Sequence, residues 1–315
     1  MKKILLKIIF YMIMGAIAVA VVNSCTDDTT PLRSIKNKST IAVLPCDSMS
    51  LNARVTPNIT AYIDMSKVHN LITAEDLEML KRLNYRIDST RCIAIVQNND
   101  KSYSLSTKRY NVDLPIWKWE TSVDSAGNIT TRQVGKRPAN VVYDVDFYLA
   151  DKGDSTTIGQ DFLRRTVLEY RAKTHEIAIR TQVPQGYQEI GDIKSRRSLG
   201  DYFGLRSRFY ASLKANDIKQ WFLLSSLDYG TSIKMPRKAQ PKEAQSLRTI
   251  TQEIDGKTIV CDPKGWIEYG DRAGTHTITF YDDSTLPTEY AFNPLTFFGQ
   301  DVVIDFLHDK ILLHP

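Results

Sequence analysis

Two aspartates occupy matching positions in the sequence. Asp64 follows the run "ITAYI" and Asp228 follows the run "WFLLSSL", 164 positions later, and each leads into a short turn. Two carboxylates held close together share one proton, because like charges at that distance cannot both ionise. The ionised carboxylate accepts a proton from water, while the protonated one donates a hydrogen bond to a peptide carbonyl. A pair held in this way is suited to amide hydrolysis and needs no metal or cofactor.

Other kinds of chemistry have little support in the sequence. The five histidines show no metal-ligand spacing, and no HExxH, Gly-rich phosphate loop or GxSxG motif occurs. No run of basic and aromatic residues could follow a nucleic-acid backbone. We therefore predict no metal, no cofactor and no nucleic-acid partner.

The surroundings of the two aspartates repeat along the chain. Residues 51–73 predict two strands joined by a turn at Pro57-Asn58, and residues 208–236 predict the same arrangement with a turn near Asn216-Asp217. Each half also closes alike, with a turn, a short helix and a strand hairpin predicted over 156–179 and again over 291–315. The repeat predicts two similar lobes with one aspartate in each.

Strand signals dominate between these segments. Only Thr73–Leu83 predicts a clear helix, with Thr73 as its N-cap. The polar, Gly-punctuated residues 183–204 lack a clear period and predict a linker. We therefore expect an all-β fold of two similar β-barrel-like lobes with few short helices, an N-terminal lobe over 39–182 and a C-terminal lobe over 205–315.

This order of elements resembles the retropepsin/pepsin-like superfamily of aspartic proteases, in a single-chain, two-lobed form. The motifs that carry the resemblance are "LDYGTS" at the second aspartate, "TIGQDFL" at 157–163 and, more loosely, "IDMSK" at the first aspartate. Ala291-Phe292-Asn293 is the counterpart of the motif at 157–163 in the second half. The resemblance implies an all-β fold, a cleft between the lobes that takes an extended polypeptide, and a catalytic pair formed by Asp64 and Asp228.

The first motif departs from the pattern of that superfamily. The threonine that braces each aspartate turn is replaced by Met65 and Tyr229, and neither carries a hydroxyl at the γ position. Gly230 is kept, but Ser66 replaces the other glycine, at an expected strain of about 1 kcal/mol; its backbone N–H is still expected to reach the Asp64 carboxylate. Lys67 would favour two ionised carboxylates over one shared proton. The residues expected to contact the polypeptide are Met65, Ser66, Tyr229, Gly230 and Thr231.

The N-terminus predicts export and lipid attachment. A basic start, "MKKILLK", precedes an apolar run of 15 residues at 8–22, which is short for a membrane span and typical of a signal peptide. Small residues precede Cys25 in "VNSC", which resembles a bacterial lipobox and implies cleavage after residue 24 and a lipid on Cys25. Residues 25–38 then predict a tether, and the expected location is the bacterial cell envelope, on the outer membrane. An uncleaved signal anchor is the alternative.

Three further cysteines remain, at positions 46, 92 and 261, and they cannot all pair within one chain. The sequence is compatible with a disulfide between Cys46 and Cys92, and it is equally compatible with buried thiols.

Three functions are compatible with these features. The two aspartates favour a membrane-tethered aspartic endopeptidase. Met65, Ser66, Lys67 and Tyr229 favour a binding protein that still grips polypeptide but has lost hydrolysis, and no feature favours a purely structural lipoprotein. Because one damaged motif disables a mechanism that needs a shared proton, we expect the binding protein.

Overall fold

The computed structural model describes residues 30–36, 38–46, 51–97, 103–197, 207–215, 218–224, 250–254, 257–261, 263–271, 274–281, 291–292 and 300–314. Strands dominate these residues, and the two helices among them are α2 (Ala74–Arg82) and α3 (Gln160–Leu163). The prediction of an all-β fold with few helices is confirmed. Neither helix is long or apolar enough to cross a bilayer.

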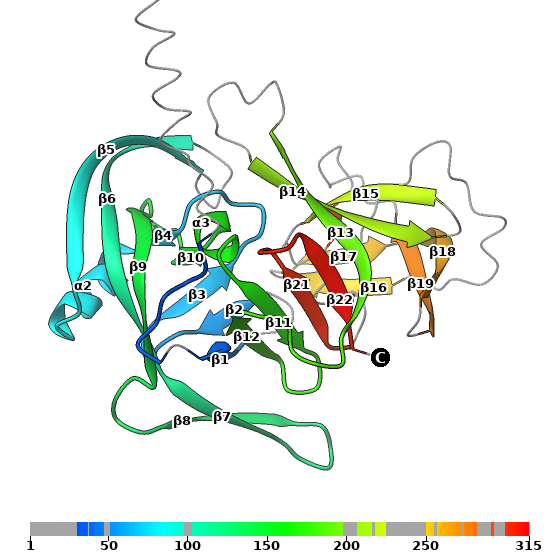
Figure 1. Cartoon of the computed structure of the whole chain (residues 1–315), viewed down its shortest axis with the longest axis horizontal. Coiled ribbons are helices and arrows are strands. Elements are labelled where there is room, and N and C mark those ends of the chain that lie inside the picture. Colours follow the sequence, from blue (N-terminus) through cyan, green and yellow to red (C-terminus); the bar gives the residue numbers. More distant parts are fainter. Residues whose placement is uncertain are drawn as a thin grey trace, which may run out of the picture.

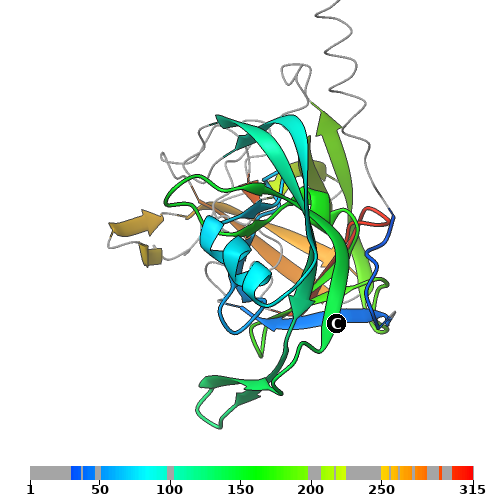
Figure 2. The ribbon, with the colours of Figure 1, turned by 90° about the vertical axis from the view of Figure 1, so that its left-hand side faces the viewer.

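A seven-stranded sheet holds most of the first half of the chain (Figure 1). Its strands, in spatial order, are β2 (Asn52–Arg54), β3 (Thr60–Ile63), β10 (Thr157–Ile158), β4 (Leu71–Ile72), β9 (Asn140–Leu149), β6 (Tyr103–Ile116) and β5 (Ile87–Gln97). The sheet is open, with β2 and β5 at its edges. The long ribbon of β5 and β6 bends strongly, and α2 lies on the near side of the sheet in Figure 2.

A nine-stranded sheet joins the two halves of the sequence. Its strands, in spatial order, are β1 (Thr40–Pro45), β12 (Glu176–Arg180), β11 (Val167–Arg171), β21 (Val302–Asp305), β22 (Lys310–Leu313), β13 (Gln188–Arg197), β14 (Ser207–Ala215), β15 (Ile218–Leu224) and β20 (Ala291–Phe292). The C-terminal hairpin β21–β22 pairs with β11 on one side and β13 on the other. Strands from both predicted lobes therefore share one hydrogen-bonded sheet.

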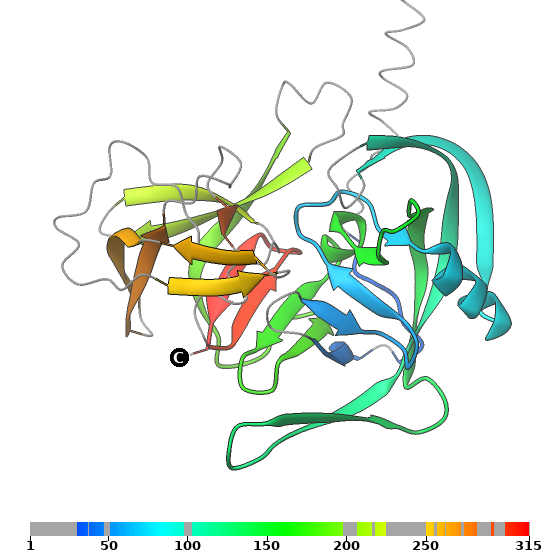
Figure 3. The same cartoon turned by 180° about the vertical axis from the view of Figure 1, so that it is seen from behind.

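Three hairpins complete the described strands. They are β7 (Lys118–Val123) with β8 (Ile129–Val134), β16 (Ile250–Ile254) with β17 (Lys257–Cys261), and β18 (Pro263–Asp271) with β19 (Gly274–Tyr281). The β7–β8 hairpin projects from the body in Figures 1 and 3, while Trp117 and Trp119 at its root are buried in the core.

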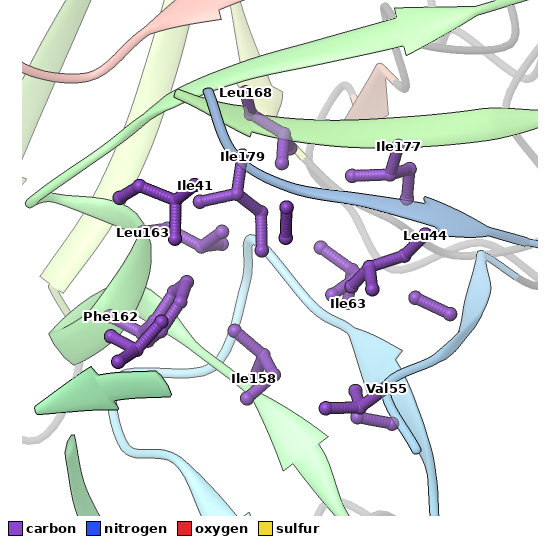
Figure 4. Close-up of a cluster of buried hydrophobic side chains, with 14 of the residues drawn as sticks. Ile41, Leu44, Val55, Ile63, Ile158, Phe162, Leu163, Leu168, Ile177 and Ile179 are labelled. Carbon is purple, nitrogen blue, oxygen red and sulfur yellow. The ribbon is translucent and has the colours of Figure 1, made fainter. Parts of the chain in front are cut away.

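The main core lies between the N-terminal part of the nine-stranded sheet and the β3–β10 region. Figure 4 shows side chains of β1, β11 and β12 facing those of β3, β10 and α3. Ile158 and Phe162 come from the segment that also carries α3, so this helix is fixed by the same apolar contacts that join the two sheets. Burial of this apolar surface is the main term that holds α3 in place.

Several local predictions are confirmed. Thr73 caps α2, since its Oγ1 accepts from the Asp76 N–H at 3.1 Å. The turn at Pro57-Asn58 joins β2 to β3. β14 and β15 pair as an antiparallel hairpin with Ala215 opposite Ile218, while the predicted turn residues Asn216-Asp217 lie outside the described residues. The hairpins β11–β12 and β21–β22 close the two halves as the repeat predicted.

The predicted linker over 183–204 contains a regular strand. Residues Gln188–Arg197 form β13, which pairs with β22 and β14 and carries an irregularity between Glu189 and Gly191. Ile190 and Ile193 of this strand are buried in the main core, and their spacing of three residues hides the period of two that marks a strand in a sequence. The domain boundaries themselves stay a prediction.

Cys46 and Cys92 are both reduced and half-buried, and the Cys46 thiol donates to the His175 carbonyl at 3.4 Å. Cys46 packs at the margin of the main core, whereas Cys92 packs against a separate small cluster around Leu71 and Tyr148. The disulfide between them that the sequence left open does not form in this structure.

The described part of the predicted tether belongs to the folded body. Leu32 is only 4% exposed and joins the main core, whereas Ile35, three residues later, is 57% exposed. The segment is fixed to β9 through hydrogen bonds from the backbone N–H of Ile35 to Val141 O and from Tyr143 N–H to Arg33 O. Short polar segments resemble tethers in sequence even when one buried residue anchors them.

Leu32→Ala is expected to lower the free energy of unfolding by about 2 kcal/mol, because it removes a buried side chain from the core. Ile35→Ala is the matched control and is expected to change it by less than about 0.5 kcal/mol, since Ile35 is exposed. Urea unfolding of both variants measures the difference. Equal stabilities would contradict the placement of this segment in the core.

Candidate functional site

The candidate site is the loop between β3 and β4, residues 64–70. Asp64 is 4% exposed, and its backbone N–H donates to the Ile158 carbonyl at 2.9 Å. Ser66 donates twice to Asp64 Oδ1, from its backbone N–H at 2.8 Å and from Oγ at 2.6 Å. The expectation that the Ser66 N–H reaches the carboxylate is confirmed.

Ser66 adapts to the glycine position without backbone strain. The positive-φ residues of the described chain do not include Ser66, so the strain of about 1 kcal/mol expected there does not arise. Ser66 also adds a hydroxyl donor to the carboxylate, which glycine lacks. Ser66 therefore stabilises the turn around Asp64, because both of its donors bind the carboxylate within the same turn.

The neighbours of Ser66 are buried. Met65 lies in the main core with no exposed surface, and Lys67 is also buried. In this structure Met65 therefore fills core space instead of offering a surface to a ligand, although the sequence predicted a ligand contact. Of the predicted contact residues in this loop, Ser66 is the one with partial exposure.

The helix α3 holds the loop by its polar groups. Gln160 donates from Nε2 to the Met65 carbonyl at 2.9 Å and from its backbone N–H to the Lys67 carbonyl at 2.8 Å. The Asp161 N–H donates to the Val68 carbonyl at 2.9 Å. The first N–H groups of a helix have no partner within the helix, so the loop carbonyls satisfy them.

Asn70 and Gly159 fasten the end of the loop. Asn70 Oδ1 accepts from the Gly159 N–H at 2.7 Å, and its Nδ2 donates to the Asp146 carbonyl on β9 at 2.9 Å. A Cβ atom at Gly159 would lie 2.7 Å from His69 O and 2.8 Å from Lys67 O. Only glycine allows this close approach of two backbones.

A hydrogen bond between His69 and Asp161 links the loop to α3 on its solvent side. His69 Nδ1 lies 2.7 Å from Asp161 Oδ2, and the His69 ring packs 4.6 Å from the Tyr148 ring at a tilt of 52°. Burial raises the pKa of the Tyr148 phenol well above its ordinary value, and burial also raises the pKa of the Cys92 thiol. Both groups therefore stay protonated near neutral pH and do not supply a nucleophile on this face.

The other predicted site residues lie outside the described residues: Asp228, Tyr229, Gly230, Thr231 and Cys25. The pairing of Asp64 with Asp228 thus stays a prediction. The strands around them do repeat, because β10 runs parallel to β3 with Ile158 opposite Ile63, and β20 runs parallel to β15 with Phe292 opposite Leu224. In both halves the strand that leads toward the aspartate is therefore paired in the same way.

No group of three or more potential metal-ligating side chains occurs in the described part of the chain. The residues that organise the loop are instead Asn70, Gln160 and the His69–Asp161 pair. The motif at 157–163 drew attention to the segment of Gln160 and Asp161, but nothing in the sequence marked Asn70.

Ser66→Ala is expected to lower the free energy of unfolding by about 1–2 kcal/mol, because it removes the hydroxyl donor to a buried carboxylate and keeps the backbone donor. Ser122→Ala, at an exposed serine of β7, is the matched control and should change it by less than about 0.5 kcal/mol. Thermal and urea unfolding measure both effects. Equal effects of the two substitutions would show that the Ser66 hydroxyl contributes nothing to the turn.

Comparison with known proteins gives no family assignment. No family model matches the chain, and no curated protein matches it. Basic 7S globulin from soybean aligns at 9% sequence identity over 90% of this chain and 95% of that chain, with a TM-score of 0.45. Conglutin gamma, a basic 7S globulin from lupine seeds, aligns at 11% identity over 88% of this chain and 95% of that chain, also with a TM-score of 0.45.

These findings correct the family resemblance drawn from the sequence. The chain is not assigned to the retropepsin/pepsin-like aspartic proteases. The two solved structures named above are seed globulins, and their TM-scores are too low to carry an argument about function. The function has to be inferred from the geometry of this chain.

Proposed function

We propose that this protein is a lipid-anchored protein of the bacterial cell envelope that binds extended polypeptide and does not cleave it. The observation that carries the binding proposal is the edge of β5, which has no strand on its outer side among the described residues. This strand is eleven residues long and lies at the end of the seven-stranded sheet, with β6 as its neighbour on the inner side. An edge strand presents unpaired N–H and C=O groups that an extended chain can satisfy.

The side chains of β5 suit such a partner. The consecutive residues Asp88, Ser89, Thr90 and Arg91 are exposed. Their polar character protects the edge from non-specific aggregation and leaves the backbone free to pair. The two signs of charge favour a polypeptide of mixed polarity over a strongly charged polymer.

The geometry at Asp64 supports binding without hydrolysis. A general acid or base must reach the reacting atoms or a water beside them. Asp64 is almost completely buried, and two donors from Ser66 already occupy Oδ1. A carboxylate held in this way stabilises the loop more than it serves acid–base chemistry.

The anchor rests on the sequence features at the N-terminus. The basic start, the apolar run at 8–22 and the small residues before Cys25 support cleavage and lipid attachment. Mass spectrometry of the protein purified from its native membrane should show a chain that begins at Cys25 and carries lipid. A chain that retains residues 1–24 would support the uncleaved signal anchor.

Binding and cleavage are tested together with a soluble form of the chain that begins at Thr26, incubated with a diverse peptide pool from about pH 3 to 7. Mass spectrometry should recover peptides that are retained but intact. Cleavage that Asp228→Asn abolishes would overturn the proposal and establish an aspartic endopeptidase.

The role of the β5 edge is tested by Ser89→Pro and Thr90→Pro. Backbone N–H groups of neighbouring residues point to opposite sides of a strand, so one proline removes an outward N–H and the other breaks the pairing with β6. We expect the proline that leaves stability unchanged to abolish peptide retention. Retention that survives in this stable variant would exclude the edge as the binding surface.

A further inference from the structure

A short motif recurs along the chain and has no part in the proposed function. Wherever an aspartate is followed by serine or threonine, the third residue is Ala, Met or Thr, although these three types make up only about one sixth of the chain. A turn that is built around aspartate sets no such rule for the third residue. The triplets begin at Asp28, Asp47, Asp88, Asp124, Asp154 and Asp283, and those at Asp88, Asp124 and Asp154 lie within the described residues.

The triplet at the tip of the β7–β8 hairpin has an exposed serine. The Asp124 carboxylate accepts from the backbone N–H groups of Ala126 and Asn128, both at 2.8 Å, and these bonds fix the turn. Ser125 lies between these contacts and is exposed. The hairpin projects from the body in Figures 1 and 3, so a large modifying enzyme can approach Ser125 without meeting the body.

The triplet in the loop between β9 and β10 has an exposed serine beside a buried threonine. Thr156 is 4% exposed, and its Oγ1 accepts from the Thr73 N–H at 3.1 Å. The Asp154 N–H donates to the Asp151 carbonyl at 3.0 Å. These contacts hold the loop on both sides of Ser155, which is exposed to solvent.

The triplet in β5 differs from the other two. Ser89 is also exposed, but it lies in a regular strand, opposite Tyr110 of β6. An enzyme that binds the acceptor segment would have to disturb this pairing, whereas a surface loop adapts more easily. Ser125 and Ser155 are therefore the better acceptors for a modification.

The charge at these triplets favours a neutral group over a phosphate. Hydrogen bonds from Asn128 lower the pKa of the Asp124 carboxyl, which is therefore ionised near neutral pH. A phosphate on the next residue would place further negative charge beside this carboxylate and would be repelled by it. A sugar is bulky, solubilising and suited to a surface position.

We propose that Ser125 and Ser155 are O-glycosylated. In the transfer, the serine Oγ forms a bond to the anomeric carbon of a sugar, while the bond from that carbon to the phosphate of an activated glycosyl donor breaks. The hydroxyl proton passes to a base of the transferase, and the donor leaves as its phosphate. Exposed loop tips are preferred sites of proteolysis, and a bulky sugar there shields the backbone.

The test is mass spectrometry of tryptic peptides of the protein purified from its native cells. Trypsin releases Ser125 within Trp119–Arg132 and Ser155 within Gly153–Arg164. We expect both peptides to carry the added mass of sugar residues, located on Ser125 and Ser155 by electron-transfer fragmentation. Chemical deglycosylation should return both peptides to the masses found for the same chain made by cell-free synthesis.

Ser122→Ala is the matched control, because Ser122 is an exposed serine of the same tryptic peptide that follows Thr121 instead of an aspartate. In the native cells, Ser125→Ala should remove the sugar from Trp119–Arg132, and Ser122→Ala should leave it in place. Unmodified masses for both native peptides, a phosphate in place of the sugar, or a sugar that persists in Ser125→Ala would each overturn the inference. These results do not depend on lipid attachment or on peptide binding.

Discussion

Asn70→Ala is expected to lower the free energy of unfolding by about 4 kcal/mol. Asn70 is 2% exposed and satisfies two backbone groups, the Gly159 N–H and the Asp146 carbonyl. Alanine leaves both without a partner, and each buried unsatisfied group costs about 1–3 kcal/mol. The loss should also loosen the Asp64 loop from α3, since the hydrogen bond from the Gly159 N–H to Asn70 is one of those that join them.

Asn58→Ala makes the same chemical change at an exposed turn residue and serves as the control. Its effect is expected to stay below about 0.5 kcal/mol. Urea unfolding measures both values, and hydrogen exchange of residues 64–70 reports the loop directly. A small effect of Asn70→Ala with unchanged exchange would contradict the role given to Asn70.

Gly159→Ala is expected to lower the free energy of unfolding by about 3 kcal/mol. The added Cβ would meet two backbone carbonyls, those of His69 and Lys67, at distances below 3.0 Å. Backbone atoms cannot rotate away as the end of a side chain can, so the loop and α3 have to separate. The hydrogen bonds from Gln160 to this loop should weaken in consequence.

The suitable comparison is Gly135→Ala, at a glycine with a positive φ and open space around its Cβ position. Its cost comes from the backbone conformation and is expected to be about 1 kcal/mol. Calorimetry of the two variants compares the cost of a close backbone contact at Gly159 with the cost of a strained backbone conformation at Gly135. Equal melting temperatures would show that the loop adapts to a Cβ atom at Gly159.

Local features could be read from the sequence where local rules determine them. Thr73 caps α2 because a threonine hydroxyl satisfies a free helical N–H, and that relation spans only three residues. The turn at Pro57-Asn58 and the hairpins at the end of each half also follow from short-range signals. The all-β fold follows from the same signals taken together.

Long-range pairing could not be predicted in this way. Residues Gln188–Arg197 are mostly polar and show no clear period, yet they form β13 because β22 and β14 lie on either side and Ile190 and Ile193 enter the core. Leu32 gave no sign in the sequence that a predicted tether would enter the core. Asn70 depends on partners 76 and 89 residues away, so no spacing rule identifies it.

The sequence predicted the organisation around Asp64 more reliably than its chemistry. The Ser66 N–H does reach the carboxylate, and the strands beside both aspartates pair in parallel in the same way. The family assignment drawn from these motifs was wrong, because motifs of three to seven residues specify a turn and a strand order and do not specify descent or activity.

The most direct test of polypeptide binding along the edge of β5 is hydrogen exchange, measured with and without a peptide that the protein retains from the diverse peptide pool. Binding along the β5 edge should slow exchange of the outward-facing amides in Ile87–Gln97, with intact peptide recovered afterwards. Slower amide exchange at residues 64–70 as well would show that the peptide also contacts the Asp64 loop. Unchanged exchange in both segments while peptide stays bound elsewhere, or recovery of cut peptide, would contradict the account.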